Sequence, residues 1–147
     1  MNKVVLVILC FLVFLSCDDS KEVEIIEFGL GTNYTLNELI NDQISKSKVP
    51  IVYFYADWCA PCKKFSKALK NTLLKQTLNK TVLIKVNVDN NEELAISYSV
   101  SAIPTFIKAG KNGVVKASIT SGEWKEDIPE NIAPIMSKLI YTQEYDK

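Results

Sequence analysis

Cys59 and Cys62 are separated by two residues, and their sulfur atoms can pass between a dithiol and a disulfide. The preceding run, residues 51–55, is apolar and rich in β-branched and aromatic side chains, which predicts a buried strand. Pro61 is tolerated in the first turn of a helix, and a helical pattern follows to about residue 78. We therefore expect Cys59 at a helix N-terminus, where free N–H groups and the helix dipole favour a thiolate.

The two thiols are predicted to have different tasks. A thiolate at Cys59 attacks a substrate disulfide, and Cys62, one turn further into the helix and more enclosed, resolves the mixed disulfide. A disulfide across two intervening residues constrains the unfolded chain little, so reactivity explains this pair better than stability does. A structural zinc site needs four ligands, and two cysteines in a chain without histidine supply half of one, which only a dimer could complete.

Composition narrows the function classes. The length, 147 residues, suits one domain, and the formal net charge is +0. A chain without basic excess is not expected to bind nucleic acid. The sequence contains neither His nor Arg, so the usual general base, metal ligand and phosphate clamp are missing.

The N-terminal segment has the pattern of a targeting sequence. Lys3 precedes an apolar run at residues 4–15, shorter than the ~20 residues that span a bilayer but suited to a secretory signal. Ser16 directly before Cys17 resembles the lipobox of bacterial lipoproteins, in which the cysteine is acylated. We expect a signal peptide at residues 1–16, lipidated Cys17 with a tether at 17–33, and the folded domain at 34–147. An ordinary cleaved signal and an uncleaved anchor are the alternatives.

Strand and helix patterns alternate along the rest of the chain. Together they predict an α/β fold, a central sheet with helices on both faces. The expected strands are residues 23–28 (at an edge), 51–55, 81–88, 104–108 and 114–120, with a turn at 111–113. The expected helices are residues 35–46, capped by Thr35, 61–78, 91–98 and about 124–145, the last bent near its prolines.

The segment 55–63, with Trp58 directly before the cysteine pair, resembles the Trp-Cys-x-x-Cys site of the thioredoxin superfamily. The wider pattern is similar to the C-terminal periplasmic domain of the disulfide interchange reductase D family. A second matching element is residues 101–105, with Ile103-Pro104. The resemblance covers roughly residues 35–145. It implies a thioredoxin fold with a mixed sheet of four to five strands, and no cofactor beyond the Cys59–Cys62 disulfide.

The resemblance also implies roles for neighbouring residues. Pro104 is expected to be cis and to present the N–H and C=O of Ile103 to an extended substrate, although an ordinary trans proline opening an edge strand is the plainer alternative. Trp58 forms an apolar wall beside the sulfur or simply packs. Ala60 and Pro61 shape the site.

Proton transfer is the point at which the sequence departs from the family. Thioredoxins carry a buried Asp six residues before the first cysteine, and Tyr53 stands there. Tyrosine is a poor base near neutral pH, since its reference pKa is ~10. The matching Lys85 is kept, but its usual carboxylate partner is gone. Asp57 and Lys85 are the candidates for proton transfer, with a water as the alternative to Asp57.

The expected function is reduction of disulfides in exported proteins. The Ala60-Pro61 dipeptide lacks the His of strongly oxidising relatives, which favours a reductase. Such a reductase needs a membrane electron donor, and the lipid anchor would hold it close to one. We expect a monomer in the bacterial cell envelope, a periplasm-facing or surface lipoprotein. An oxidase or isomerase on the same fold and a non-redox peptide-binding module are the alternatives.

Overall fold

The computed structural model describes residues 21–29, 31 and 33–141, and its centre is a five-stranded sheet. The predicted signal peptide and Cys17 lie outside the described residues. The sheet order is β1-β3-β2-β4-β5, in which β1 and β2 run parallel to β3, and β4 is antiparallel to both β2 and β5. The strands are β1 (Glu24–Glu27), β2 (Val49–Tyr55), β3 (Thr81–Asn87), β4 (Thr105–Ala109) and β5 (Val115–Thr120). The predicted mixed α/β sheet is confirmed.

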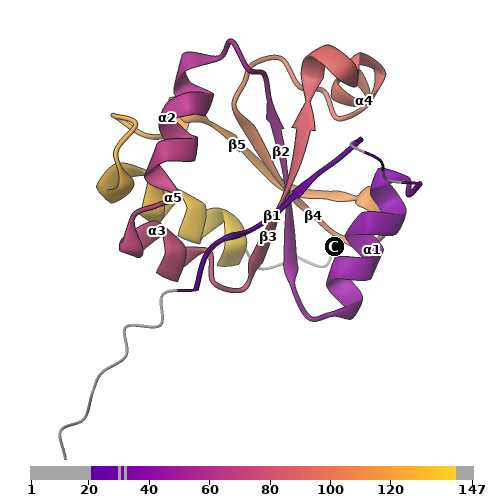
Figure 1. Cartoon of the computed structure of the whole chain (residues 1–147), viewed down its shortest axis with the longest axis horizontal. Helices are drawn as coiled ribbons and strands as arrows, with labels where there is room; N and C mark the ends of the chain where they lie inside the picture. Colours follow the sequence, from indigo (N-terminus) through magenta and orange to yellow (C-terminus); the bar gives the residue numbers. More distant parts are fainter. Residues whose placement is uncertain (1–20, 30, 32, 142–147) are drawn as a thin grey trace, which may run out of the picture.

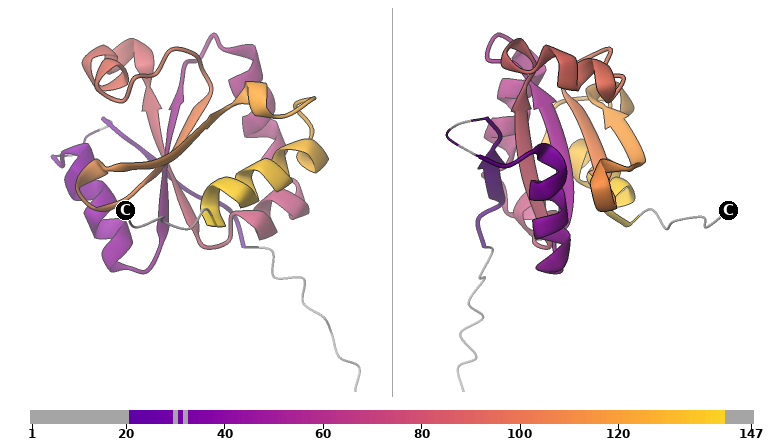
Figure 2. Two further views of the ribbon diagram at one scale, coloured as in Figure 1. Left: turned by 180° about the vertical axis from the view of Figure 1, so that it is seen from behind. Right: turned by 90° about the vertical axis from the view of Figure 1, so that its right-hand side faces the viewer.

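Among the described residues, five α-helices cover the two faces of the sheet. Helices α2 (Ala60–Ala68), α3 (Thr72–Thr77) and α5 (Pro129–Tyr141) pack on one face, and α1 (Leu36–Ser45) and α4 (Glu92–Ser97) pack on the other (Figure 1). The rotated views of Figure 2 place the last helix beside the third. Within residues 21–29, 31 and 33–141, none of the helices has the length and hydrophobicity of a membrane span.

Strand β2 is central because it is apolar on both faces. Ile51 and Tyr53 enter the core beneath α2, α3 and α5, whereas Val52 and Phe54 enter the core beneath α1 and α4. All four side chains are completely buried. Alternate side chains of a strand point to opposite faces, so a strand buried on both sides reads as a continuous apolar run. The short segment that leads from β2 to Cys59 therefore begins at the middle of the sheet.

Strand β1 lies inside the segment assigned above to the tether. Its residues pair in parallel with β3, from Glu24 opposite Val82 to Glu27 opposite Lys85. The predicted edge strand at 23–28 is thus confirmed, with β1 at Glu24–Glu27, and part of the 17–33 segment belongs to the sheet.

Two helix predictions were wrong in their bounds. The single helix expected at 61–78 is interrupted, because Asn71 caps α3 by accepting a hydrogen bond from the N–H of Leu73 at 2.8 Å. The last helix begins at Pro129 rather than Trp124. Trp124 is extended, and its indole donates to Asp127 at 2.9 Å, while Pro129 suits a first helical position. Residues 142–145 of the predicted helix lie outside the described residues.

Local signals at other element ends are confirmed. Thr35 caps α1 in a reciprocal capping box with Glu38. The turn at Lys111–Gly113 places Asn112 at φ 57° and Gly113 at φ 75°, the left-handed region that Asn and Gly tolerate best.

Candidate active site

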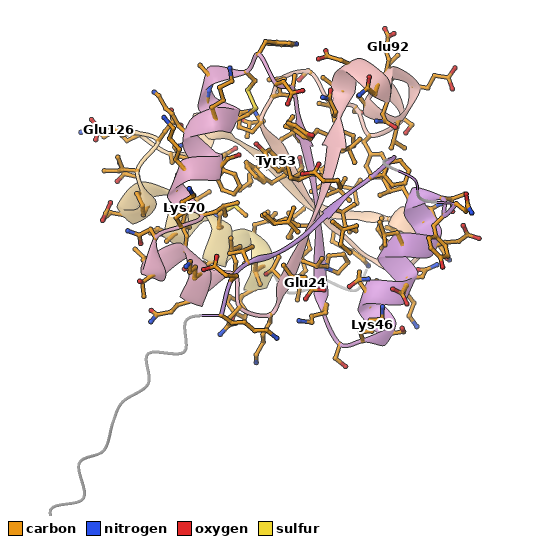
Figure 3. The ribbon with its side chains drawn as sticks, viewed as in Figure 1. Glu24, Lys46, Tyr53, Lys70, Glu92 and Glu126 are labelled. Carbon is orange, nitrogen blue, oxygen red and sulfur yellow. A yellow bond between two sulfur atoms is a disulfide. The ribbon has the colours of Figure 1, made fainter. Side chains whose placement is uncertain are left out.

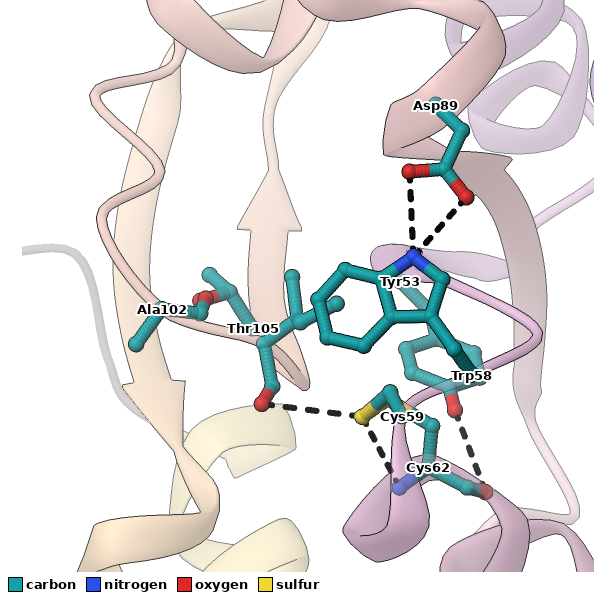
Figure 4. Close-up of a disulfide and its surroundings, with 8 residues drawn as sticks. Tyr53, Trp58, Cys59, Cys62, Asp89, Ala102 and Thr105 are labelled. Atoms are coloured by element: carbon teal, nitrogen blue, oxygen red, sulfur yellow. Dashed lines mark hydrogen bonds between the residues drawn. A yellow bond between two sulfur atoms is a disulfide. The ribbon is translucent and has the colours of Figure 1, made fainter.

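Cys59 and Cys62 form a disulfide at the N-terminus of α2, with an S–S distance of 2.09 Å. Cys59 is the N-cap residue of this helix, and its Sγ accepts a hydrogen bond from the backbone N–H of Cys62 at 3.2 Å (Figure 4). The predicted placement at a helix N-terminus is therefore confirmed. In the dithiol state the same N–H and the helix dipole favour negative charge on the Cys59 sulfur.

Both cysteines are enclosed in this oxidised state. Cys59 is 3% exposed and Cys62 is 2% exposed, so the expected difference in enclosure is not present in the disulfide form. Ala60, the first residue of α2, is exposed next to the pair. Pro61 is in the first turn, where its missing N–H leaves no hydrogen bond unmade.

The loop before β4 faces the disulfide. The Ile103–Pro104 bond is cis, as expected, and the carbonyl oxygen of Ile103 lies 3.7 Å from Cys59 Sγ. The hydroxyl of Thr105 donates to the carbonyl of Ala102 at 2.6 Å and holds the loop closed. A backbone acceptor is thus fixed beside the sulfur that a substrate would approach.

Trp58 stands at the surface next to this loop. Its side chain is 67% exposed, and its indole nitrogen donates to both carboxylate oxygens of Asp89 (Figure 4). The indole borders a hollow of about 400 Å³ whose other walls are mainly apolar, with Val88, Ala95, Val100, Ala102 and Ile103. The Trp58 ring therefore forms one side of a hollow next to the disulfide and does not pack in the core. Asp89 was missed by the sequence reasoning, although its place in the short turn that follows β3, at the same end of the sheet, was a usable signal.

Tyr53 lies beneath the pair, near the middle of the molecule (Figure 3). Its hydroxyl donates to the carbonyl of Cys62 at 3.4 Å, and its ring stacks on Phe106 with centroids 4.8 Å apart. Burial raises the pKa of Tyr53 far above its ordinary value of 10.0. Tyr53 therefore stays protonated at neutral pH, and it fills the site without acting as a base.

The two candidates for proton transfer meet at one pocket. Asp57 and Lys85 line a pocket of about 350 Å³ together with Cys62 and Ser66. Asp57 accepts a hydrogen bond from Asn87 at 3.4 Å. The pocket thus places Cys62 near charged side chains of both signs, the Asp57 carboxylate and the Lys85 ammonium among them.

Lys85 has a carboxylate partner that the sequence reasoning did not name. Its ammonium pairs with Glu27 Oε1 at 2.5 Å and lies 4.2 Å from the centroid of the Tyr55 ring. The Tyr55 hydroxyl donates to Glu27 Oε2 at 3.1 Å. Glu27 comes from β1, on the far side of β3, so only the strand register brings it to the site.

The fold and the site together define a class: a thioredoxin-fold domain with a cysteine pair at the N-terminus of the helix after the central strand. No group of three His, Cys, Asp or Glu residues that could hold a metal ion occurs in the part of the chain that the structure describes.

Comparisons with known proteins give the family. The family model for thioredoxin matches residues 32–134. The chain is 31% identical over 103 residues to Thioredoxin-T of Drosophila melanogaster, which covers 69% of this chain and 61% of that protein. It is 44% identical over 75 residues to mitochondrial thioredoxin of Mus musculus, covering 50% of this chain and 44% of that one. Reduced thioredoxin pre-protein of Schistosoma mansoni superposes with a TM-score of 0.56 at 32% identity, over 80% of this chain and 99% of that one.

The chain therefore belongs to the thioredoxin family. It spans less than two thirds of the two sequence relatives, 61% of one and 44% of the other. Thioredoxins need no cofactor, because the redox-active disulfide is part of the protein itself.

Proposed function

We propose that this chain is a thiol:disulfide oxidoreductase that reduces disulfides in exported proteins. The observation that carries the proposal is the position of Cys59, which caps α2 and accepts the N–H of Cys62 beside the carbonyl of Ile103. Cys59 is the nucleophile and Cys62 the resolving residue.

The cycle has two exchange steps. The Cys59 thiolate attacks a substrate disulfide, which forms a mixed disulfide and releases one substrate sulfur as a thiolate. The Cys62 thiolate then attacks Cys59 Sγ, the bond to the substrate breaks, and the second substrate sulfur leaves as a thiolate. Two electrons pass to the substrate, and a membrane-bound dithiol donor returns them to the Cys59–Cys62 disulfide.

The surface around the sulfurs suits an extended polypeptide. Ile103 offers its backbone groups beside Cys59, and an extended segment pairs with such groups as an added strand. The hollow bordered by Trp58 is lined mostly by apolar side chains and can take a side chain of that segment. Substrate binding through Trp58, Ile103 and Pro104 is part of the proposal.

The location rests on residues 1–17. The apolar run and the Ser16-Cys17 pair support a lipoprotein of the bacterial cell envelope, anchored through Cys17 near its electron donor. The relatives reported above come from animals, so they do not bear on this location. Metabolic labelling with a palmitate analogue tests it: we expect label and membrane recovery in the parent chain and loss of both in Cys17→Ser, and an unlabelled parent contradicts the anchor.

A trapping experiment tests the reaction. In Cys62→Ser the resolving thiol is missing, so mixed disulfides with substrates should accumulate at Cys59 and disappear on reduction. Cys59→Ser is the matched control and should trap nothing. Peptide binding that persists after replacement of both cysteines, with no trapped disulfide, would instead identify a non-redox binding module.

The direction of electron flow needs its own measurement. Equilibration with glutathione buffers gives the reduction potential of the Cys59–Cys62 couple. A potential near that of the strongly oxidising periplasmic oxidases, about −120 mV, would favour the oxidase and contradict the reductase.

A further inference from the structure

One row of side chains crosses three strands of the sheet next to the disulfide. The strand registers place Glu27 of β1 opposite Lys85 of β3, and Lys85 opposite Tyr53 of β2. Residues paired in register point to the same face of a sheet, here the face covered by α2. A carboxylate on the edge strand is thereby connected, through Lys85, to the pocket beside Cys62.

Glu27 uses both carboxylate oxygens to hold its neighbours. Oε1 pairs with the Lys85 ammonium at 2.5 Å, and Oε2 accepts from the Tyr55 hydroxyl at 3.1 Å. The Lys85 side chain is 17% exposed and that of Glu27 is 36% exposed. A charge pair that is partly withdrawn from water is screened less than a surface pair, so its loss is felt by groups nearby.

The resolving step needs a proton to leave Cys62. The neutral thiol is a poor nucleophile, and its thiolate must attack Cys59 Sγ while the bond to the substrate sulfur breaks. Tyr53, directly beneath, donates its own hydrogen bond to the Cys62 carbonyl and cannot accept this proton. The side of Cys62 left for this proton is the pocket that it lines together with Asp57 and Lys85.

The charges around that pocket determine the ease of this ionisation. Asp57 faces it from the connection before α2, Lys63 and Lys67 face it from α2, and Lys85 and Tyr55 face it from the sheet. On another side of α2, Lys64 pairs with Asp127 at 3.1 Å. Among these groups Lys85 is the cation whose charge Glu27 compensates.

We propose that Glu27 is a positioning residue for the resolving step: it holds the Lys85 ammonium at the pocket and compensates its charge, and so sets how readily the Cys62 thiol ionises. This inference rests on the proposed exchange between Cys59 and Cys62. The carboxylate with this role thus comes from β1, a strand outside the segment that carries the cysteine motif.

The sign of the effect distinguishes an electrostatic role from a structural one. Glu27→Gln leaves an uncompensated cation near Cys62, which favours the thiolate and lowers the pH at which Cys62 ionises. Lys85→Met leaves an uncompensated anion and raises it. We expect opposite shifts of roughly half to one pH unit, the size of one charge acting across a partly solvated pocket. In the double variant the two shifts should largely cancel.

The experiment measures, by stopped-flow absorbance, the rates at which two thionitrobenzoate anions are released in turn. The full chain carries Cys10→Ser and Cys17→Ser, so that the reduced Cys59 and Cys62 are its only thiols. Excess dithiobis-nitrobenzoate reacts with Cys59 and releases one thionitrobenzoate. Cys62 then attacks Cys59 Sγ and releases the second, and the rate of this second release from about pH 5 to about pH 10 reports the ionisation of Cys62.

Glu24→Gln is the matched control. Glu24 also lies on β1 and pairs with a lysine, Lys48, at 3.0 Å, but at the opposite end of the strand from Glu27 (Figure 3). It should leave the profile unchanged. Lys85→Arg, which keeps the charge, should restore the parent profile, and circular dichroism checks that each variant folds.

Shifts of the same sign in Glu27→Gln and Lys85→Met, or shifts no larger than that of Glu24→Gln, would overturn the inference while the proposed exchange stands. Absence of both releases in the parent would overturn the exchange itself, and the role of Glu27 with it.

Discussion

The indole nitrogen of Trp58 donates to both carboxylate oxygens of Asp89, at 3.2 Å and 3.1 Å. Asp89 is itself held, because its N–H donates to the side chain of Asn87 at 2.9 Å. The indole is 67% exposed, so packing alone does not fix its position. Asp89 therefore orients the ring that borders the hollow beside the disulfide.

Removing this acceptor should affect large substrates more than small ones. In Asp89→Ala the indole loses its partner, and a net hydrogen bond of ~1 kcal/mol corresponds to about a fivefold loss in kcat/KM for a disulfide-containing protein. Reaction with dithiobis-nitrobenzoate, which has no chain to place in the hollow, should change less than about twofold. Asp89→Asn keeps one acceptor oxygen and should lie between. Equal losses for both substrates would contradict a role in substrate binding.

Tyr53 should contribute to stability through its ring and little through its hydroxyl. The ring stacks on Phe106, and the hydroxyl makes one long hydrogen bond of 3.4 Å. Tyr53→Phe should lower the free energy of unfolding by less than ~1 kcal/mol, and Tyr53→Ala by roughly 3–5 kcal/mol. Urea unfolding of the oxidised chain measures both. A Tyr53→Phe variant whose second thionitrobenzoate release has a changed pH profile would contradict the assignment of Tyr53 as a non-base.

The reacting pair and its helix were predictable because their signals are local. The cysteines are three positions apart, and the strand before them and Pro61 after them place them at a helix N-terminus. The Ile103-Pro104 element was found differently, because its role came from the resemblance of residues 101–105 to the thioredoxin superfamily. Side-chain chemistry of this kind depends on a few adjacent residues, which a sequence shows directly.

Residues that act through tertiary contacts were not predictable in this way. Glu27 reaches Lys85 across 58 positions and Asp89 reaches Trp58 across 31. Either contact requires the strand order and register, which no local pattern contains. The break at Asn71 was missed for another reason: helical periodicity continues through residues 61–78, and the competing N-cap is a single side-chain hydrogen bond.

The capping box of α1 should make a measurable contribution to stability. The Thr35 hydroxyl accepts from the N–H of Glu38 at 3.2 Å, and the Glu38 carboxylate accepts from the N–H of Thr35 at 2.8 Å. Thr35→Ala should lower the free energy of unfolding by ~1 kcal/mol at neutral pH, whereas Thr35→Ser should retain most of it. Equal unfolding midpoints for Thr35→Ala and the parent would contradict this.

The same capping box predicts an acid dependence. Hydrogen bonds from the backbone and then the side chain of Thr35 lower the pKa of Glu38 below its ordinary value of 4.5. A lowered folded pKa means that the Glu38 contribution is present above pH 4.5 and is lost as the pH falls through the folded value. The difference in unfolding free energy between the parent and Glu38→Gln should therefore shrink on acidification, and urea titrations on both sides of this range measure it.

Alkaline pH should destabilise the fold through the tyrosines beside the active site. Burial, followed by the charge of Glu27, raises the pKa of Tyr55 to about 12 from an ordinary value of 10.0. The unfolded chain then loses this proton first, so the contribution is complete below pH 10.0 and declines as the pH rises toward about 12.

Tyr55→Phe tests this dependence, because phenylalanine has no proton to lose. Its free energy of unfolding should fall less steeply than that of the parent between about pH 9 and about pH 11, with Tyr34→Phe, at an exposed position, as the matched control. Tyrosinate absorbance of the native chain should show that Tyr55 ionises at a higher pH than free tyrosine. If the free energies of unfolding of Tyr55→Phe and the parent fall in parallel, the Tyr55 hydroxyl and its hydrogen bond to Glu27 are not the cause of the lost stability at alkaline pH.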